Sequence, residues 1–322
     1  MQEPESIRFY CGLNERTWNH HPVAPGVYAC IAPVYGRTVR TKSINQVCVP
    51  TETRILQDSG AFSDGPGQRV SLEQALERQI AHAQRYGYDA QVTHRASYDV
   101  LIDEKWRGET RHKARWSEHE AQQAVKETVQ AAAYLACHRH GKKAVLSAQG
   151  VSATQYLTCV QQIVPWLEEG DVVGLGGWCI LGKIPSLMAV FCETMQLVLP
   201  FLGKEHVKWV HIWGVCYAPA LEVLVWLCAH NGIHVSTDSA HPSIHPVFGQ
   251  WGYANWRDSS YVRPPILDSC KAHEFEQCTT CRGLERARHV AATRQWLQTF
   301  PVTSPSWLMK PRQLVLMGGL YE

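Results

Sequence analysis

The sequence lacks a long apolar run and a leader segment. No stretch reaches the ~18 consecutive apolar residues that a membrane helix requires. The run that comes closest, Val190 to Leu202, is interrupted by Glu193 and Gln196. The opening segment MQEPESIRFY has neither the basic start nor the apolar core of a signal peptide. We therefore expect a cytoplasmic protein that makes no contact with a membrane.

An excess of charge of one sign is also missing. The 31 Lys and Arg residues against 29 Asp and Glu residues give a formal net charge of +2. Any surface for nucleic acid must therefore be a local patch. The sequence has neither a Gly-x-x-x-x-Gly-Lys loop nor a dinucleotide fingerprint after its first expected strand. These absences argue against chemistry driven by ATP or by a redox cofactor.

Cysteine is not scarce, but the twelve cysteines do not form the regular framework of a secreted disulfide protein. They are scattered, and several lie in apolar periodic segments, namely Cys137, Cys159, Cys192 and Cys228. In such positions a free thiol behaves as a small core residue. A reducing, cytoplasmic setting fits this distribution better than an oxidising one.

Helix and strand signals alternate from residue 71 onward. Ser71 with Gln74 and Ser117 with Glu120 are capping-box pairs that predict the starts of two helices. Each expected helix leads to a short run rich in Val and Ile, which is typical of βα units around a parallel sheet. The length of 322 residues suits a single β/α barrel with insertions.

Two regions break this rhythm. Residues 1–50 are rich in Pro, Asn and His, and we expect them to supply the first strand, near Tyr28 to Ala32, together with covering loops. Residues 240–290 carry many prolines, aromatics and cysteines and are interpreted as an insertion. No interdomain linker separates these regions from the rest, so one domain is predicted over residues 1–322.

Short apolar runs of strand length stop at polar or glycine residues. The groups that follow them are Asp58-Ser59-Gly60, Gln149-Gly150, Gly174 to Gly177, Trp213-Gly214 and Asp238. In a parallel barrel the carboxyl ends of the strands meet on one rim, where such folds carry their active sites. The sequence therefore predicts an α/β protein, a (β/α)8 TIM barrel with a zinc-binding insertion near the C-terminus.

The zinc site in this insertion is inferred from a pair of cysteines, Cys278 and Cys281, followed by His289 and preceded by Cys270. A Cys-x-x-Cys pair lets two thiolates bind one tetrahedral zinc, and a third Cys with a His completes a closed, structural site. His273 could replace Cys270 or His289. A redox pair is the less favoured alternative. The predicted zinc-binding subdomain covers residues 264–290.

The acidic residues at the strand ends suggest glycosyl transfer. A single carboxylate at a rim most often caps a helix or solvates a loop. Asp58 and Asp238 on one rim, with Asp103 as a third candidate, favour catalysis instead. Two neighbouring carboxyl groups are what a double displacement at a sugar carbon requires, because one attacks and the other handles protons or binds the base.

At these residues the chain resembles the tRNA-guanine transglycosylase superfamily. Asp58-Ser-Gly-Ala-Phe62 is similar to its Asp-Ser-Gly-Gly-(Phe/Tyr) motif. Further similar segments, in the same order, are Ser147 to Gly150, Gly174 to Trp178, His211 to Val215, Asp238 to Pro242, and Pro265 to Cys270 with Cys278 and Cys281. Two details depart from the family pattern: Ala61 replaces a glycine, and seven residues separate Cys270 from Cys278 where the family has one.

The resemblance implies a role for each matching residue. Asp238 would be the nucleophile that displaces guanine and forms a covalent glycosyl-enzyme, and Asp58 would contact the base and transfer protons. The implied base-binding residues are Ser59, Gln149, Gly176 and Gly177, with Trp213 against the face of the base. Asp103 would recognise the base too, although a loop or cap carboxylate is an equal alternative there. The zinc would be structural.

The substrate implied by the resemblance is DNA. The opening of the chain and its length are similar to the DNA-modifying branch, which exchanges guanine for a 7-deazaguanine such as the 7-cyano form. Because this branch is found in phages and bacteria, the resemblance implies a bacterial protein, or a phage-encoded one that acts in the host cytoplasm. The alternatives are exchange in tRNA, a non-catalytic nucleic-acid-binding paralogue, and a barrel hydrolase acting on free nucleosides or sugars. A helper ATPase that opens the duplex and a homodimer stay open as partners.

One segment offers a local surface for nucleic acid. Lys105-Trp106-Arg107, Arg111 to Lys113 and Arg115-Trp116 interleave cations with indoles beside the expected rim. Cations pair with phosphates, and Trp can stack on an exposed base. A solvated helix start is an equal alternative for this segment.

Overall fold

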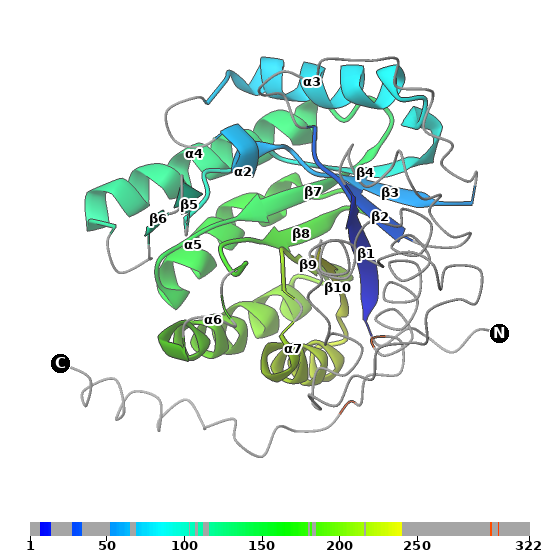
Figure 1. The fold of residues 1–322 in the computed structure, drawn as a ribbon. Coiled ribbons are helices and arrows are strands. Elements are labelled where there is room, and N and C mark those ends of the chain that lie inside the picture. Colours follow the sequence, from blue (N-terminus) through cyan, green and yellow to red (C-terminus); the bar gives the residue numbers. More distant parts are fainter. Residues whose placement is uncertain are drawn as a thin grey trace, which may run out of the picture.

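The computed structural model describes residues 7–13, 28–33, 52–64, 69–102, 104–106, 109–111, 116–179, 181, 185–215, 217–239, 297 and 302. Eight parallel strands in these ranges close into a barrel in the order β1-β10-β9-β8-β7-β4-β3-β2, and Figure 1 labels each of them. The strands are β1 (Arg8–Leu13), β2 (Tyr28–Ile31), β3 (Arg54–Gln57), β4 (Val92–Ala96), β7 (Lys143–Ala148), β8 (Val172–Leu175), β9 (Trp209–Ile212) and β10 (His234–Ser239). The predicted α/β class and TIM-barrel architecture are thus confirmed.

Helices alternate with the strands and cover the outside of the barrel (Figure 1). They are α2 (Ala61–Asp64), α3 (Leu72–Arg85), α4 (Glu118–Cys137), α5 (Ala153–Ile163), α6 (Pro185–Lys204) and α7 (Ala218–His230), with 3-10 turns at η1 (Asp89–Gln91) and η3 (Val164–Trp166). Both predicted capping boxes form, at Ser71 with Gln74 and at Ser117 with Glu120. Each box satisfies orphan N–H groups at the helix start, which is why α3 and α4 begin where the sequence predicts.

The expected first strand is wrong. The run near Tyr28 is the second strand, because Arg8–Leu13 forms β1 and closes the barrel between β10 and β2. β1 pairs Tyr10 with Asp238 on one side and with Tyr28 on the other. A short strand that starts with arginine and contains a glycine gives a weak local signal, so only pairing on both edges identifies it.

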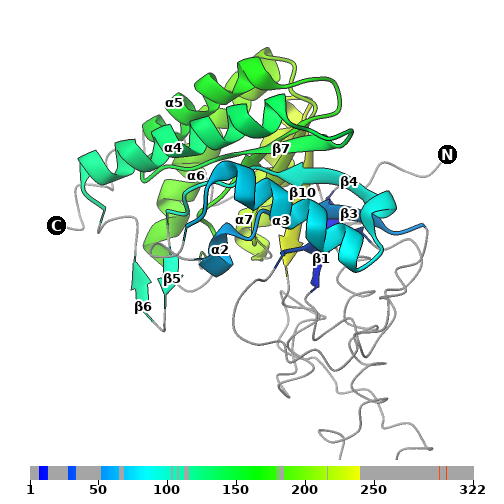
Figure 2. The same ribbon diagram turned by 90° about the horizontal axis from the view of Figure 1, so that it is seen from above.

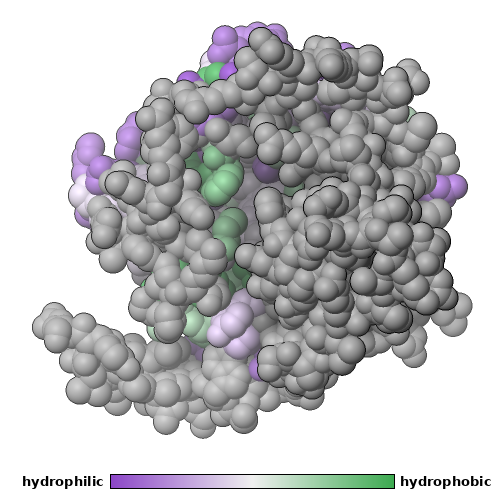
Figure 3. All heavy atoms as spheres, viewed as in Figure 1, coloured by the Kyte–Doolittle hydropathy of each residue, from purple (hydrophilic) through white to green (hydrophobic). Residues whose placement is uncertain are grey.

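Two apolar layers hold the barrel together. The outer layer lies between the strands and helices and includes fully buried Leu146, Val173, Phe191 and Leu224. The inner layer fills the barrel itself with Tyr10, Cys30, Leu56, Ala96, Val145 and Val172. Each fully buried Leu, Val or Phe contributes about 1.5–3 kcal/mol of transfer free energy. Among the described residues that are coloured in Figure 3, most polar ones lie along the edges of the face and apolar ones lie near its middle.

Helix α6 is more apolar than the sequence suggested. Its window Leu187–Lys204 is long and apolar enough to cross a membrane by length and composition alone. In the fold, however, α6 packs against α5 and α7, and Phe191, Met195 and Leu199 are fully buried in the outer layer. Packing on the barrel therefore accounts for its apolar face.

The basic segment between β4 and α4 contains a hairpin. β5 (Glu104–Trp106) and β6 (Glu109–Arg111) pair antiparallel, with Glu104 opposite Arg111. The alternative of a helix start is therefore wrong for these residues. Figure 2 shows the hairpin standing away from the barrel. Because it follows β4 and precedes α4, it belongs to the rim formed by the carboxyl ends of the strands.

Several predicted residues lie outside the described part of the chain. They are Asp103 and the zinc candidates Cys270, His273, Cys278, Cys281 and His289, together with the whole predicted subdomain 264–290. The zinc site and the role of Asp103 therefore stay predictions.

Candidate active site at the barrel rim

Three carboxyl groups gather where parallel strands end. Asp58 directly follows β3, Asp99 follows β4 and Asp238 lies near the end of β10. Only β1 and β2 separate β3 from β10 around the barrel. The structure therefore places Asp58 and Asp238, predicted from the sequence as a pair, on one rim. Asp99 is a third acid that the sequence patterns did not single out.

Electrostatics shows that these acids lie close together. The pKa of Asp58 is raised to about 7, first by burial, then by the charges of Asp238 and Asp99, against weaker hydrogen bonds from the backbone N–H groups of Ser59 and Gly60. The pKa of the Cys30 thiol is raised well above its usual range by burial and then by the charges of Asp238 and Asp58. Cys30 is an inward residue of β2. The charge of Asp238 thus acts on Asp58, and the charges of both acids act on the Cys30 thiol inside the barrel.

A carboxyl group with a pKa near 7 can both give and accept a proton at neutral pH. Asp58 is only partly exposed, and its backbone is held from both sides. Its N–H donates to the carbonyl of Ile31 at 2.8 Å, and its own carbonyl accepts from the Gln79 side chain at 3.0 Å. The acid is therefore fixed at the end of β3, so that its protonation can change without movement of the strand.

Asp238 is anchored through one oxygen. Its Oδ1 accepts from the Gly214 N–H at 2.8 Å and lies 3.2 Å from Nε2 of His211. Oδ2 receives no hydrogen bond from the residues that the structure describes, and the side chain is 17% exposed. A carboxylate with one tethered oxygen and one open oxygen has the form that a nucleophile requires.

Only glycine fits at position 214. Its φ of +70° lies in the left-handed region, and an added Cβ would come within 2.4 Å of the Cys179 sulfur. This backbone conformation directs the N–H of Gly214 at Asp238. The Trp-Gly turn after β9 is therefore part of the site.

Asp99 forms a buried pair with a predicted residue, Gln149. The Gln149 Nε2 donates to Asp99 Oδ2 at 2.6 Å, and its Oε1 accepts from the Ile102 N–H at 3.4 Å. Burial is the main cause that raises the pKa of Asp99. Gly176 makes room for this pair, since an added Cβ would lie 2.1 Å from the Gln149 nitrogen. Gln149 is fully buried, so in this structure it orients Asp99.

The other predicted residues line the same rim with different exposure. Trp213 is partly exposed, and its Nε1 donates to the Ser147 hydroxyl at 3.2 Å. Ser59 is buried; its hydroxyl lies 3.5 Å from Asp58 Oδ1 and accepts from the Ala61 N–H at 3.3 Å. Gly177 adopts a φ of +80° and is buried. Ser59 therefore contacts the acid itself, whereas the Trp213 indole keeps an open side.

The sequence carries only a weak signal for Asp99. The strand before it, β4, has the polar sequence Val-Thr-His-Arg-Ala, and the motif resemblance favours Asp103 four positions further along. His211 belongs to a matching motif and was given no role. His211 lies on β9, and Trp213 directly follows this strand, two residues further along. Because side chains alternate along a strand, both side chains lie on its inward face.

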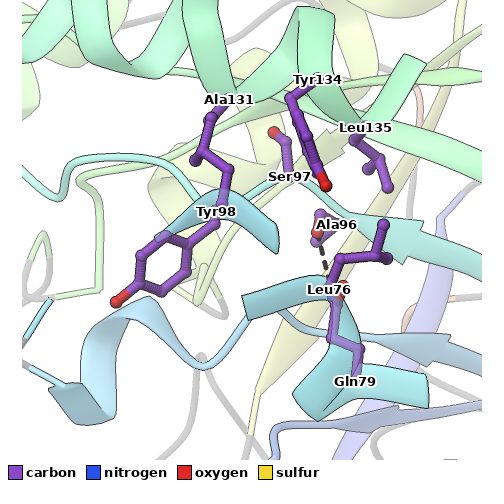
Figure 4. A pocket seen from close by; sticks show the side chains of 9 residues that line it. Leu76, Gln79, Ala96, Ser97, Tyr98, Ala131, Tyr134 and Leu135 are labelled. Carbon is purple, nitrogen blue, oxygen red and sulfur yellow. Dashed lines mark hydrogen bonds between the residues drawn. The ribbon is translucent and has the colours of Figure 1, made fainter. Parts of the chain in front are cut away.

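The pocket drawn in Figure 4 is separate from these acids. It lies between α3, α4 and the end of β4, and it is lined by Leu72, Leu76, Gln79, Ala96, Ser97, Tyr98, Ala131, Tyr134 and Leu135. The Gln79 side chain crosses it to donate to the Ala96 carbonyl at 3.0 Å. Its lining holds no carboxyl group among the described residues, so we interpret it as a packing gap behind β4.

Within the described residues, no group of three or more His, Cys, Asp and Glu side chains could hold a metal ion. The rim acids are spread over the ends of separate strands and are engaged by amide, imidazole and backbone donors. What the described geometry provides is a proton-transferring acid, a tethered carboxylate and a buried acid–amide pair.

Comparison with models of known protein families gives no match, and comparison with curated protein sequences gives no significant match. The function must therefore be inferred from the rim itself and from the resemblance of its motifs.

Proposed function

We propose that the protein is a DNA-guanine transglycosylase, a pentosyltransferase that exchanges guanine in DNA for a 7-deazaguanine base such as the 7-cyano form. The observation that carries the proposal is the coupling of Asp58 and Asp238, because burial and the charge of Asp238 raise the pKa of Asp58 to about 7 at the barrel rim. Double displacement at a sugar carbon needs this combination of a proton carrier and an ionised nucleophile.

In the first step, the Asp238 carboxylate attacks C1′ of the target nucleoside. The bond from C1′ to the base breaks, its electron pair leaves with guanine, and Asp58 supplies the proton that guanine needs. The product is a covalent glycosyl ester on Asp238. In the second step, the incoming deazaguanine gives its ring proton to Asp58 and attacks C1′, and the electron pair of the ester bond returns to Asp238.

No ATP or redox cofactor is required for this exchange. One glycosidic bond is traded for another of similar energy, and protons and electrons balance over the two steps.

The base would be recognised by the buried pair and the turns beside it. Guanine and its 7-deaza analogues present an N–H and an amino group on one edge, and a carboxylate is an acceptor for both. We assign this role to Asp99, with Gln149 orienting it and Gly176 and Gly177 offering backbone groups. The role that the resemblance implies for Asp103, which lies outside the described residues, stays a separate prediction. The partly exposed Trp213 would lie against the face of the base.

Contact with DNA would involve the β5–β6 hairpin. A base inside a duplex is shielded, so exchange requires its extrusion or a single-stranded target. The hairpin sequence carries Lys105, Trp106, Arg107 and Arg111, and its backbone follows β4 on the same rim as the acids. Cations and an indole at that place suit phosphate pairing and base stacking.

Zinc would be structural in this proposal. It would be held by Cys270, Cys278, Cys281 and His289, with His273 as the alternative for Cys270 or His289, and no catalytic step involves it.

Mass spectrometry of nucleosides tests the proposal. DNA and tRNA are each incubated with the protein and a panel of deazaguanines, then digested to nucleosides. A deazaguanine nucleoside in the DNA digest is the expected result. Its appearance in tRNA alone would make the protein a tRNA enzyme. Breakdown of free nucleosides would indicate a hydrolase. The absence of product with all of these substrates would favour the alternative of a non-catalytic nucleic-acid-binding paralogue.

A further inference from the structure

A buried hydrogen-bonded series lies beneath the predicted nucleophile. Ser236 Oγ lies 3.0 Å from Nδ1 of His211, and Nε2 of the same ring lies 3.2 Å from Oδ1 of Asp238. His211 is fully buried and Ser236 is 4% exposed. The three residues belong to β9 and β10, which are neighbours in the barrel.

The imidazole ring has little freedom to turn. It packs edge-on against Trp213, with ring centres 4.3 Å apart, and against Tyr10, with ring centres 5.7 Å apart. Ser236 also lies 3.3 Å from the Val210 carbonyl, to which its hydroxyl can donate. Both ring nitrogens of His211 therefore face fixed partners.

The partners decide which nitrogen carries a proton. A carboxylate oxygen only accepts, so Nε2 of His211 must be the donor to Asp238. When the ring is neutral, the Ser236 hydroxyl donates to Nδ1. When the ring is protonated, Nδ1 donates to Ser236, whose hydroxyl turns to the Val210 carbonyl. Rotation of one hydroxyl thus serves both forms of the ring, and the Nε2 proton points at Asp238 in each.

We propose that His211 is the positioning residue of the nucleophile, and that Oδ2 of Asp238 is the oxygen that bonds to C1′. This inference rests on the proposed function. The Nε2–H of His211 and the N–H of Gly214 together occupy Oδ1, so the carboxylate cannot rotate without losing both donors. The same two donors stabilise the carboxylate again when it departs in the second step.

Two substitutions of His211 separate hydrogen bonding from packing. His211→Gln retains a side-chain N–H near the position of Nε2, whereas His211→Leu fills the space with no donor. The rate at which the denaturant-resistant covalent complex with DNA forms is measured in single turnover. The affinity for 7-cyano-7-deazaguanine and the midpoint of thermal unfolding are measured beside it. We expect His211→Leu to slow complex formation by about 10²-fold, in the range found when one preorganised donor is removed. His211→Gln should recover most of that rate, and the affinity for the base should not change in either variant.

Different outcomes overturn different claims. A wild-type rate in His211→Leu would remove the role of His211. Equal slowing in folded His211→Gln and His211→Leu would show that the ring acts by packing alone. If the wild-type protein forms no covalent complex with DNA or tRNA, the proposed function itself fails.

A second measurement does not depend on activity, and its main readout uses the wild-type protein. Nitrogen NMR of the His211 ring in the wild-type protein should show a proton on Nε2, with a shift of that signal in Asp238→Asn. A neutral ring that carries its proton on Nδ1 would contradict the inference.

Discussion

The charge of Asp238 adds to burial in raising the pKa of Asp58 across the rim of the barrel, although the two residues stand on strands far apart in the sequence. The charge of Asp238 can act on Asp58 because β1 and β2 close the barrel between β10 and β3, so that both strands end on one rim. This proximity has measurable consequences for catalysis, pH dependence and stability.

Replacing Asp238 by Asn should abolish both base exchange and the covalent complex with DNA. The amide is nearly isosteric but lacks the charge that attacks C1′, so a reduction of about 10⁴-fold or more is expected for a covalent nucleophile. Denaturing electrophoresis detects the complex, and isotope-labelled guanine measures exchange. Glu193→Gln, on the exposed face of α6, is the matched control. Exchange at the wild-type rate in Asp238→Asn would assign the nucleophile to another residue.

The pH dependence of complex formation should follow Asp58. Its pKa of about 7 means that the protonated acid is present below this pH and is lost above it. If Asp58 protonates departing guanine, the single-turnover rate should fall about tenfold per pH unit above that value. In Asp58→Asn the single-turnover rate should be low and should not fall in this way above about pH 7. A wild-type rate that stays level at alkaline pH would contradict the role.

Asp58 should also reduce the stability of the fold at neutral and alkaline pH. Its pKa is raised from 3.8 to about 7 on folding. The folded state therefore binds this proton more tightly, and the stabilisation is fully present below about pH 4 and lost as the pH rises through 7. Asp58→Asn should thus be more stable than the wild type at about pH 8, by at most about 4 kcal/mol. Denaturant unfolding at about pH 4 and at about pH 8 measures the difference in stability between the variant and the wild type. This difference should be smaller at the lower pH.

Gly214→Ala should impair the site more than it impairs the fold. The substitution forces a side chain into a φ of +70° and into contact with Cys179. Gly232→Ala is a matched control, because Gly232 has a φ of +67° and nothing within 4 Å of an added Cβ. The left-handed φ should cost each variant about 1–2 kcal/mol of unfolding free energy, and the contact with Cys179 should add to this cost in Gly214→Ala alone. Only Gly214→Ala should also slow the covalent step, and equal rates in the two variants would contradict a role for the Gly214 N–H.

Removing the cations of the hairpin should weaken DNA binding without altering the base pocket. The triple change of Lys105, Arg107 and Arg111 to Ala should lower the slope of log affinity against log salt by about 0.9 for each phosphate that is no longer neutralised, or about 0.7 on single strands. Affinity for the free deazaguanine should stay the same. Lys126→Ala, at an exposed position of α4, is the control. An unchanged salt dependence would place the DNA elsewhere on the protein.

Local patterns were enough to predict the barrel and most of its rim. The capping pairs at Ser71 and Ser117 locate two helices, because they depend on residues three positions apart. The runs ending at Asp58 and Asp238 locate two strand ends, because a buried strand is apolar along its length.

Features that depend on contacts between distant strands were not predicted. β1 is recognisable only by its pairing with β2 and β10. Asp99 is identified only by the hydrogen bond that its carboxylate accepts from Gln149. His211 is identified only by its contact with Asp238, which forms because β9 and β10 are neighbours. The local sequence pattern does not specify these contacts, because they depend on the register of the closed sheet.

The pairing of β1 with β10 also bears on how the molecule is made. During synthesis, β1 leaves the ribosome well before β10, so one of its edges has no partner until β10 emerges. Until then the sheet is open, with an unpaired strand edge that other chains could join. The pairing that brings Tyr10 opposite Asp238 also closes the barrel. The acids therefore reach their places on the rim only when this long-range pairing is finished.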